Sequence, residues 1–278
     1  MWKMYDELIN GIPAGHIVEE VVVGSSWTMV KAGRLCGVAH TVKTDTRPRM
    51  LPEVVVGMDL KDVAAAAKSW NFIEAGIGMA AVNAYYNALD RLLSLGVELQ
   101  PKKGRKVSVS AEINGTGEDR ILEEDVLFGT EDRRNEDPFD DPPKYMAGKK
   151  VAVVGHFPRI VQQLSGLAEL SILERSPSEG DYPDSACEFL IPEQDFLFIT
   201  GMTLTNKTLP RLLQIAGDRV EVSVVGPSGT ASDILFRYGV DNISGFTVTD
   251  PEYLRTALSL GDRAIFNGGL MYTYRKSL

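Results

Sequence analysis

The stretch that decides the fold is Lys150-Val151-Ala152-Val153-Val154-Gly155-His156-Phe157-Pro158. Its first five residues are mostly branched and apolar, which predicts a buried strand. The glycine and proline that follow predict a turn into a helix running through Leu164. Further strands are predicted at Glu169–Leu173, Phe196–Ile199, Val220–Val225 and Ile243–Val248, with helices at Leu209–Ala216, Ser228–Tyr238 and Pro251–Leu260 and an edge strand at Arg263–Phe266. Apolar strands separated by helices are typical of a parallel sheet covered on both faces, so residues 149–278 are predicted to form an α/β, Rossmann-like domain.

Residues 1–115 follow a different order, in which strands come together and helices follow. We predict a short helix, a strand, two hairpin arms and two helices, at Trp2–Ile9, Ile17–Val23, Trp27–Val30, Leu35–Ala39, Asp59–Ser69 and Asn71–Leu95. In the last helix, small residues recur every four positions from Gly76 to Ala88, which favours close packing against a sheet or another helix. This order predicts an α+β domain.

Between these regions, residues 116–148 are rich in charge and proline. Such a composition cannot bury a core, so we interpret this segment as a surface connector. The sequence thus predicts three parts: a domain at 1–115, a connector at 116–148 and a domain at 149–278.

Composition narrows the choice of partners. The formal net charge of −9 argues against nucleic acid, because phosphate binding requires clustered basic residues. No apolar run approaches the roughly 20 residues that span a bilayer. Only two cysteines are present, Cys36 and Cys187, which fits a reducing compartment. We therefore expect a cytoplasmic protein with a small-molecule ligand and no nucleic-acid or membrane partner; a homo-oligomer stays open.

The loops after four predicted strands are expected to meet at one edge of the sheet. They are Gly155–Pro158, Glu174–Ser176, Thr200–Thr203 and Gly226–Thr230. In a doubly wound sheet, ligands bind along this edge where the strand order reverses. Their convergence, more than any one loop, predicts a binding site.

Gly155 stands where a dinucleotide fold has its first fingerprint glycine, but the second and third glycines are missing, so NAD binding is not expected. Glu174 lies nineteen positions later, at the end of the second strand. An acid there binds ribose hydroxyls in nucleotide-binding folds, including S-adenosylmethionine-dependent methyltransferases. Glu174 is equally compatible with a simple ion pair to Arg175 or a nearby lysine.

The segment Thr200-Gly201-Met202-Thr203-Leu204-Thr205-Asn206-Lys207-Thr208 holds four hydroxyls, an amide and an ammonium group between a strand and a helix. One helix cap requires only one of these groups. We therefore predict that Thr203, Thr205, Asn206 and Ser228 form an anion-recognition rim, with an apolar contact for a ligand ring from Phe157 or Met202. Ser228 is also a plausible helix cap.

Candidates for acid–base chemistry are His156, Glu174 and Lys207. The three histidines and two cysteines lack metal-ligand spacing, and no nucleophile elbow is present. The sequence therefore predicts no metal site and identifies no cofactor.

With Gly155–Pro158, Thr200–Thr208, Gly226-Pro227-Ser228 and the helical segment Gly76-Ile77-Gly78-Met79-Ala80-Ala81-Val82-Asn83-Ala84, the chain resembles the putative heavy-metal chelation family. The match covers nearly the whole chain apart from the connector. The resemblance implies an enolase amino-terminal-like domain followed by a Rossmann-like domain, with a ligand site in the cleft between them.

The resemblance also implies ligand-binding residues from both sides of that cleft. The strand-end loops already supply the candidates of the second domain, Gly155, Phe157, Glu174, Gly201, Met202, Thr203, Thr205, Asn206, Gly226 and Ser228; from the first domain the resemblance adds Ser25, Ser26 and Asn83. The implied role is the synthesis or handling of a metal-chelating compound, such as a pterin-, flavin- or siderophore-like molecule, by condensation, hydrolysis or group transfer. A non-catalytic carrier of a metal chelate and a methyltransferase-like enzyme remain as alternatives.

Overall fold

The computed structural model describes residues 2–100, 144–261 and 265–276. The first part contains helices α1 (Trp2–Asn10), α2 (Leu60–Ala64), α3 (Phe72–Tyr86) and α4 (Leu89–Ser94) and strands β1 (Glu20–Val23), β2 (Trp27–Ala32), β3 (Leu35–His40) and β4 (Glu98–Gln100). The second part contains strands β5 (Lys150–Val154), β6 (Glu169–Glu174), β7 (Tyr182–Pro183), β8 (Phe196–Thr200), β9 (Glu221–Val225), β10 (Asn242–Val248) and β11 (Gly269–Arg275). Its helices are α6 (Pro158–Leu164), α7 (Cys187–Leu190), α8 (Met202–Thr205), α9 (Leu209–Ala216), α10 (Asp233–Arg237) and α11 (Pro251–Ser259). None of the described helices is long and apolar enough to cross a membrane.

The small sheet is antiparallel, with the order β1-β2-β3, and α3 packs closely on it. The contact is tightest at Gly37 in β3, where a Cβ atom would lie 2.1 Å from the Ala84 nitrogen. On the other side of α3, a Cβ at Gly78 would lie 2.0 Å from the Ala67 nitrogen. The stripe of small residues therefore lets the helix approach the sheet closely, as the sequence predicts, and Gly78, outside the stripe, lets it approach the neighbouring helical turn.

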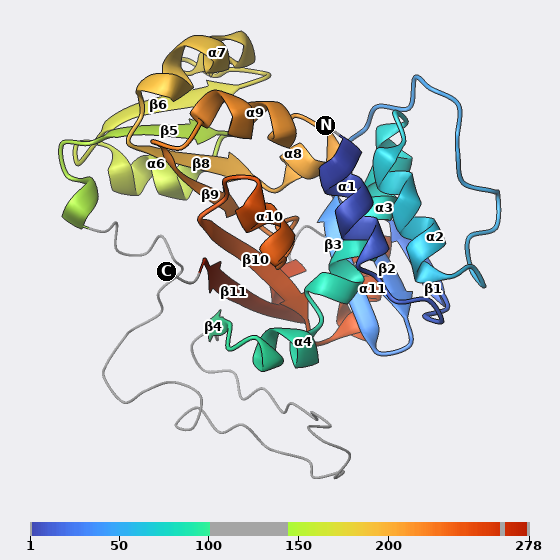
Figure 1. Ribbon diagram of the computed structural model, residues 1–278. Coiled ribbons are helices and arrows are strands. Elements are labelled where there is room, and N and C mark those ends of the chain that lie inside the picture. The colour runs from blue at the N-terminus through green and yellow to red at the C-terminus, as the bar shows by residue number, and fades with distance from the viewer. Residues whose placement is uncertain (1, 101–143, 262–264, 277–278) are drawn as a thin grey trace.

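The large sheet has eight strands in the order β4-β11-β10-β9-β8-β5-β6-β7. The six strands from β10 to β7 in this order run parallel, whereas β11 is antiparallel to both β10 and β4. The chain leaves β5 toward β6 and β7 and returns on its other side at β8, so the strand order reverses at β5. In Figure 1, α7 and α9 cover one face of this part of the sheet and α6 covers the other.

Alternate residues of β5 pack on opposite faces of the large sheet. Val151 and Val153 contact the cluster that contains Ile160 of α6, whereas Ala152 belongs to a larger core that contains Leu213 of α9. That larger core continues into α1 and α3. The two predicted domains therefore share one hydrophobic interior.

Several predicted elements differ from the structure. The sheet is mixed, because β11 and β4 pair antiparallel, and β4 comes from the predicted first domain. An edge strand was expected at Arg263–Phe266, of which residues 265 and 266 are described. There the prediction is wrong, because Ile265–Gly268 form a 3-10 helix and the strand follows at Gly269–Arg275. The predicted boundaries at 115 and 149 stay predictions, and most of the connector lies outside the described residues.

Two helices also begin or end elsewhere. The long helix predicted at Asn71–Leu95 is divided after Tyr86, because the backbone at Ala88 leaves the helical conformation with ψ of 133°. The helix expected from Ser228 begins only at Asp233, where Ser232 caps it by accepting the Ile234 N–H. Ser228 is therefore not a helix cap.

Candidate functional site

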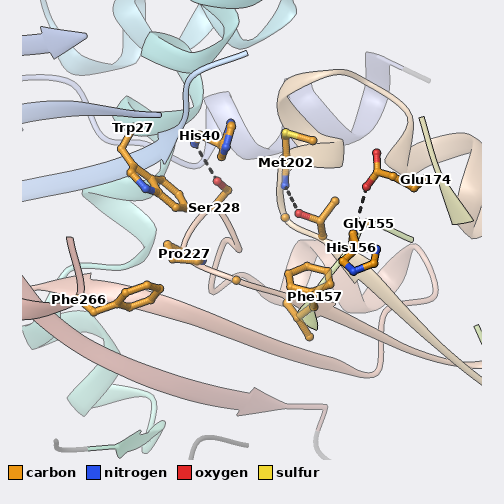
Figure 2. Close-up of a pocket in the computed structure, with 14 residues that line it drawn as sticks. Trp27, His40, Gly155, His156, Phe157, Glu174, Met202, Pro227, Ser228 and Phe266 are labelled. Atoms are coloured by element: carbon orange, nitrogen blue, oxygen red, sulfur yellow. Dashed lines mark hydrogen bonds between the residues drawn. The ribbon is translucent and has the colours of Figure 1, made fainter. Parts of the chain in front are cut away.

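A chamber of about 320 Å³ opens at the carboxyl ends of β5, β6, β8 and β9. Residues of the small sheet close its other side. We call it the aromatic chamber; its walls are formed by Trp27, His40, Gly155, His156, Phe157, Glu174, Thr200, Gly201, Met202, Val225, Gly226, Pro227, Ser228 and Phe266. Figure 2 shows Trp27 and Phe266 on one side of the chamber and Phe157 and His156 on the other.

Two glycines with positive φ make room for the ring of Phe157. Gly155 ends β5 with φ of 106°, and Gly226 follows β9 with φ of 99°. A Cβ at Gly155 would lie 3.2 Å from the ring, and one at Gly226 would lie 3.9 Å from it. Such φ angles favour glycine, so these turns place an aromatic wall directly above two strand ends.

His156 is held in place by a carboxylate that sequence reasoning missed. Its Nδ1 atom lies 3.0 Å from Asp181 Oδ2. The Asp181 side chain is only 2% exposed and also accepts the Ser178 N–H at 2.9 Å. Burial acts to raise the pKa of Asp181, but the hydrogen bonds from Ser178 and His156 outweigh it and hold this pKa below its usual range. The His156 ring is 36% exposed, so it is oriented and still accessible.

The Glu174 carboxylate organises the loops around it. One oxygen accepts the backbone N–H of His156 at 3.0 Å, and the other accepts those of Arg175 and Ser176 at 2.7 and 3.4 Å. The Arg175 side chain instead lies 3.5 Å from Asp184. The Glu174 carboxylate therefore accepts the backbone N–H of the first strand–helix turn, at the place where dinucleotide folds bind a phosphate.

The first part of the chain reaches the chamber through Trp27 and His40, at paired positions of β2 and β3. Their rings meet edge to face at 5.2 Å, and the His40 N–H donates to Ser228 Oγ at 2.9 Å. Ser25 and Ser26 were predicted to contribute from this side, but they line neither chamber that we describe. Ser25 and Ser26 lie in the turn just before β2, and Trp27, the first residue of β2, lines the aromatic chamber in their place.

Two buried asparagines, one in α3 and one at the C-terminal cap of α3, fix the loop after β9. Asn83 donates to the carbonyls of Val38 and Ser228 and accepts from Thr230 Oγ1 at 2.6 Å. Asn87, one turn later, donates to Gly229 O and accepts the Ala231 N–H at 2.9 Å. Asn83 is fully buried, so it positions the chamber wall and does not line the chamber.

The predicted anion-recognition rim is not assembled in the structure. Thr203 donates to Thr200 O at 2.7 Å, Thr205 is fully buried in α8, and Asn206 accepts from Thr208. Ser228 accepts from the His40 backbone. Thr203, Asn206 and Ser228 thus bond different partners, and the buried Thr205 hydroxyl has none among the described residues.

Lys207 lies away from both chambers. It is 7% exposed, has φ of 67°, and donates from Nζ to Thr205 O at 2.8 Å. Its ammonium group lies 4.9 Å from the centre of the Phe72 ring and 5.7 Å from that of Trp70. Burial lowers the pKa of Lys207 to about 8. The prediction that Lys207 acts on a ligand beside Gly155 is therefore not supported by its position.

A second chamber, of about 300 Å³, lies beyond Glu174. We call it the charged chamber. It shares Gly155, Glu174, Thr200 and Met202 with the aromatic chamber, and its other walls are Val154, Leu173, Arg175, Asp184, Ser185, Cys187, Glu188, Thr203, Asn206, Thr208, Arg211, Leu212 and Ile215. The predicted residues Thr203 and Asn206 belong to this space.

The donor set does not fit a bare metal ion held by the protein. Among residues 2–100, 144–261 and 265–276, no three His, Cys, Asp or Glu side chains lie close enough together to bind one. In the aromatic chamber, His156 is paired with Asp181 and Glu174 is bound by backbone amides. We therefore derive no step that depends on a protein-bound metal.

Fold and site together define an α/β protein with a mostly parallel sheet and a small-molecule chamber where the strand order reverses. Two family models, both described as putative heavy-metal chelation, match residues 5–86 and 137–276. The chain belongs to this family, which confirms the resemblance inferred from the sequence.

Solved structures of similar proteins agree with this assignment. A crystal structure of a family member of unknown function from Desulfitobacterium hafniense has a TM-score of 0.79 and 33% identity, covering 99% of this chain and 98% of that one. One from Pyrococcus horikoshii has a TM-score of 0.71 at 19% identity, covering 99% and 98%, and shows the fold alone. An uncharacterized protein from Methanocaldococcus jannaschii is 34% identical over an alignment of 121 residues, which covers 40% of this chain and 47%, about half, of that relative.

Proposed function

We propose that the aromatic chamber binds a flat, polar heterocycle and that His156 acts on it as a general acid or base. The observation that carries the proposal is the oriented His156–Asp181 pair on the wall of a chamber lined by aromatic rings. The family description, putative heavy-metal chelation, supports extending the proposal to a compound that itself binds metals, of pterin-, flavin- or siderophore-like chemistry.

The shape and lining of the chamber favour a ring. Trp27, Phe157 and Phe266 offer aromatic surface, and Met202 and Pro227 add apolar contact. Stacking on an aromatic side chain contributes roughly 0.5–1.5 kcal/mol beyond the burial of apolar area. Burying about 200 Å² of ring surface adds roughly 5 kcal/mol at about 25 cal/mol per Å². Together these terms approach the roughly 8 kcal/mol of micromolar affinity, and a few polar contacts supply the rest.

We assign acid–base chemistry to His156 because only one of its two ring nitrogens is bound by Asp181. Nδ1 is engaged by Asp181, so Nε2 is the atom that meets a ligand. An imidazole held by a buried carboxylate is the arrangement that orients a base in many hydrolases and transferases. Condensation, hydrolysis and group transfer on a heterocycle all require one such proton transfer.

The carrier alternative has an observation in its favour. Apart from His156, polar groups on the wall are used to hold the loops: Ser228 accepts from His40, and Thr200 Oγ1 accepts the Met202 N–H at 3.3 Å. A chamber whose polar groups largely hold its own loops is also compatible with binding alone.

The proposal keeps the interpretation of the two parts as enolase amino-terminal-like and Rossmann-like, with the site between them. Its supports are the residues that each part contributes, Trp27 and His40 from the first and the four strand ends from the second. A cytoplasmic location and a homo-oligomer stay predictions.

Calorimetric titration with pterin, riboflavin and 2,3-dihydroxybenzoate tests the binding. We expect one of them to bind, and Trp27→Ala to weaken its binding by about ten-fold, or 1.4 kcal/mol. Trp70→Ala is the matched control, because Trp70 is exposed and lines neither chamber. Equal weakening by both substitutions, or none by Trp27→Ala, contradicts the proposed site.

Mass spectrometry of the bound compound after incubation then separates an enzyme from a carrier. Conversion by the wild-type protein that is lost in His156→Gln, with binding retained, supports catalysis. Binding without conversion in both proteins supports the carrier.

A further inference from the structure

We propose that the charged chamber binds a nucleoside that carries no phosphate. This inference goes beyond the proposed function, because it assigns a second ligand group to a space that the heterocycle does not occupy. The chamber lies between the carboxyl ends of β5, β6, β7 and β8, directly at the reversal of strand order.

The inner walls of the charged chamber are apolar on two sides. Val154 and Leu173 come from the ends of β5 and β6, and Leu212 and Ile215 come from the facing side of α9. These side chains belong to one hydrophobic cluster, and the apolar surface that they present to a space of about 300 Å³ suits a planar base.

Polar groups follow at the positions that a nucleoside requires. Asp184 and Ser185 come immediately after β7 and offer an acceptor and a hydroxyl at the far rim. They suit the amino edge of a base. Glu174, after β6, lines both chambers and stands where an acid binds ribose hydroxyls.

The local charge disfavours a phosphate. Three carboxylates, those of Glu174, Asp184 and Glu188, face two guanidinium groups, those of Arg175 and Arg211. Arg211 is bound by Glu188 through two hydrogen bonds of 2.9 and 2.6 Å, and Arg175 lies beside Asp184. The first-turn amide of His156 already donates to Glu174. Both lining guanidinium groups are thus paired with carboxylates, and the carboxylates outnumber them, which disfavours an anionic ligand.

The shared walls indicate the direction in which such a ligand continues. Gly155 and Thr200 line both chambers. With the base between the apolar walls and the ribose at Glu174, the 5′ substituent passes these residues toward the aromatic chamber and His156. All such ligands contain a nucleoside, either free or extended at its 5′ position by a neutral or cationic group.

Calorimetry on the full chain with adenosine, S-adenosylhomocysteine and AMP tests this inference. We expect adenosine to bind and AMP to bind about ten-fold more weakly, because of its charge. S-adenosylhomocysteine binding more tightly than adenosine identifies a 5′-extended nucleoside as the ligand, whereas equal affinity identifies a free nucleoside.

Variants locate the binding. Ser185→Trp fills the mouth of the chamber at an exposed residue, and Asp184→Asn removes one rim charge; each should weaken adenosine binding by about ten-fold. Glu179→Gln, an exposed carboxyl outside both chambers, is the matched control and should leave the affinity unchanged. The melting temperature without ligand confirms that each variant is folded.

The inference is overturned if no nucleoside binds at about 1 mM, if AMP binds more tightly than adenosine, or if Ser185→Trp leaves adenosine binding intact. Its failure is distinct from that of the proposed function, because Trp27→Ala should weaken heterocycle binding and leave adenosine binding within about two-fold.

Discussion

Replacing Asn87 by alanine should destabilise the protein by about 3 kcal/mol, because Asn87 joins α3 to the loop that forms one wall of the aromatic chamber. Its Nδ2 donates to Gly229 O at 2.8 Å and to Phe246 O at 3.3 Å, and its Oδ1 accepts from Ala231 N and the Tyr272 hydroxyl, both at 2.9 Å. The Tyr272 hydroxyl and Gly229 O still bond each other at 3.1 Å after the substitution.

The cost therefore comes mainly from Ala231, a fully buried residue whose N–H loses this acceptor. One buried N–H without a partner costs roughly 1–3 kcal/mol, and the lost Nδ2 bonds add about 1 kcal/mol. For a chain of this size, about 3 kcal/mol lowers the melting temperature by roughly 6–12 °C.

Urea unfolding monitored by circular dichroism measures the difference. Asn242→Ala is the control: its side chain bonds Glu221 and Ser223 near the surface, so the expected loss is below about 1 kcal/mol. A loss below about 1 kcal/mol for Asn87→Ala as well would refute the reasoning that this side chain holds the loop.

Three further predictions concern Asp181, Lys207 and Gly201. The folded-state pKa of Asp181 lies below its ordinary value. Its contribution to stability is therefore present above that ordinary value and is lost as pH falls through the folded-state pKa. In unfolding measured against pH, Asp181→Asn should reduce this loss of stability at acid pH. Burial lowers the pKa of Lys207 to about 8, from an ordinary value of 10.5. Between these two values the folded chain binds fewer protons than the unfolded chain, so the free energy of unfolding should rise with pH. This rise should be absent in Lys207→Met. Gly201→Ala should destabilise the protein by about 2 kcal/mol or more and weaken heterocycle binding, because the added Cβ would lie 2.5 Å from the Gly229 nitrogen.

Each of these has a clear contrary outcome. An unchanged acid limb in Asp181→Asn would show that the carboxylate does not gain from its His156 contact, and a persisting alkaline rise in Lys207→Met would assign that rise to another group. Gly76→Ala serves as control for Gly201→Ala, since its Cβ would come no closer than 3.4 Å to His40 O. Equal effects of the two glycine substitutions would refute the close approach of the loops.

The sequence predicts the placement of Gly155, Glu174 and Gly226 well, because parallel strands end at a common edge whatever their detailed packing. It does not predict β4 and β11, since an antiparallel pair between residues more than a hundred positions apart leaves only a short local pattern. Asp181 was missed for a similar reason: it lies in the loop between β6 and β7, whose path no periodicity determines.

Side-chain direction accounts for the remaining differences. Counting donors in Thr200–Thr208 identifies an unusual segment, but Thr205 is buried in α8, and Thr203 and Asn206 line the charged chamber and not the aromatic one. A shift of one or two residues separates the predicted Ser25 and Ser26 from Trp27, which faces the chamber. In both cases the orientation depends on where a short element begins, and propensity does not determine this to a single residue.

The most direct test of the central claim is a crystal structure of the chain with whichever of pterin, riboflavin and the catechol 2,3-dihydroxybenzoate binds it. The account predicts electron density for the ring in the aromatic chamber, in contact with Trp27 or Phe157 and with a polar ring atom about 3 Å from His156 Nε2. A ring bound outside this chamber, or inside it with His156 Nε2 directed away from every ligand atom, would contradict the account.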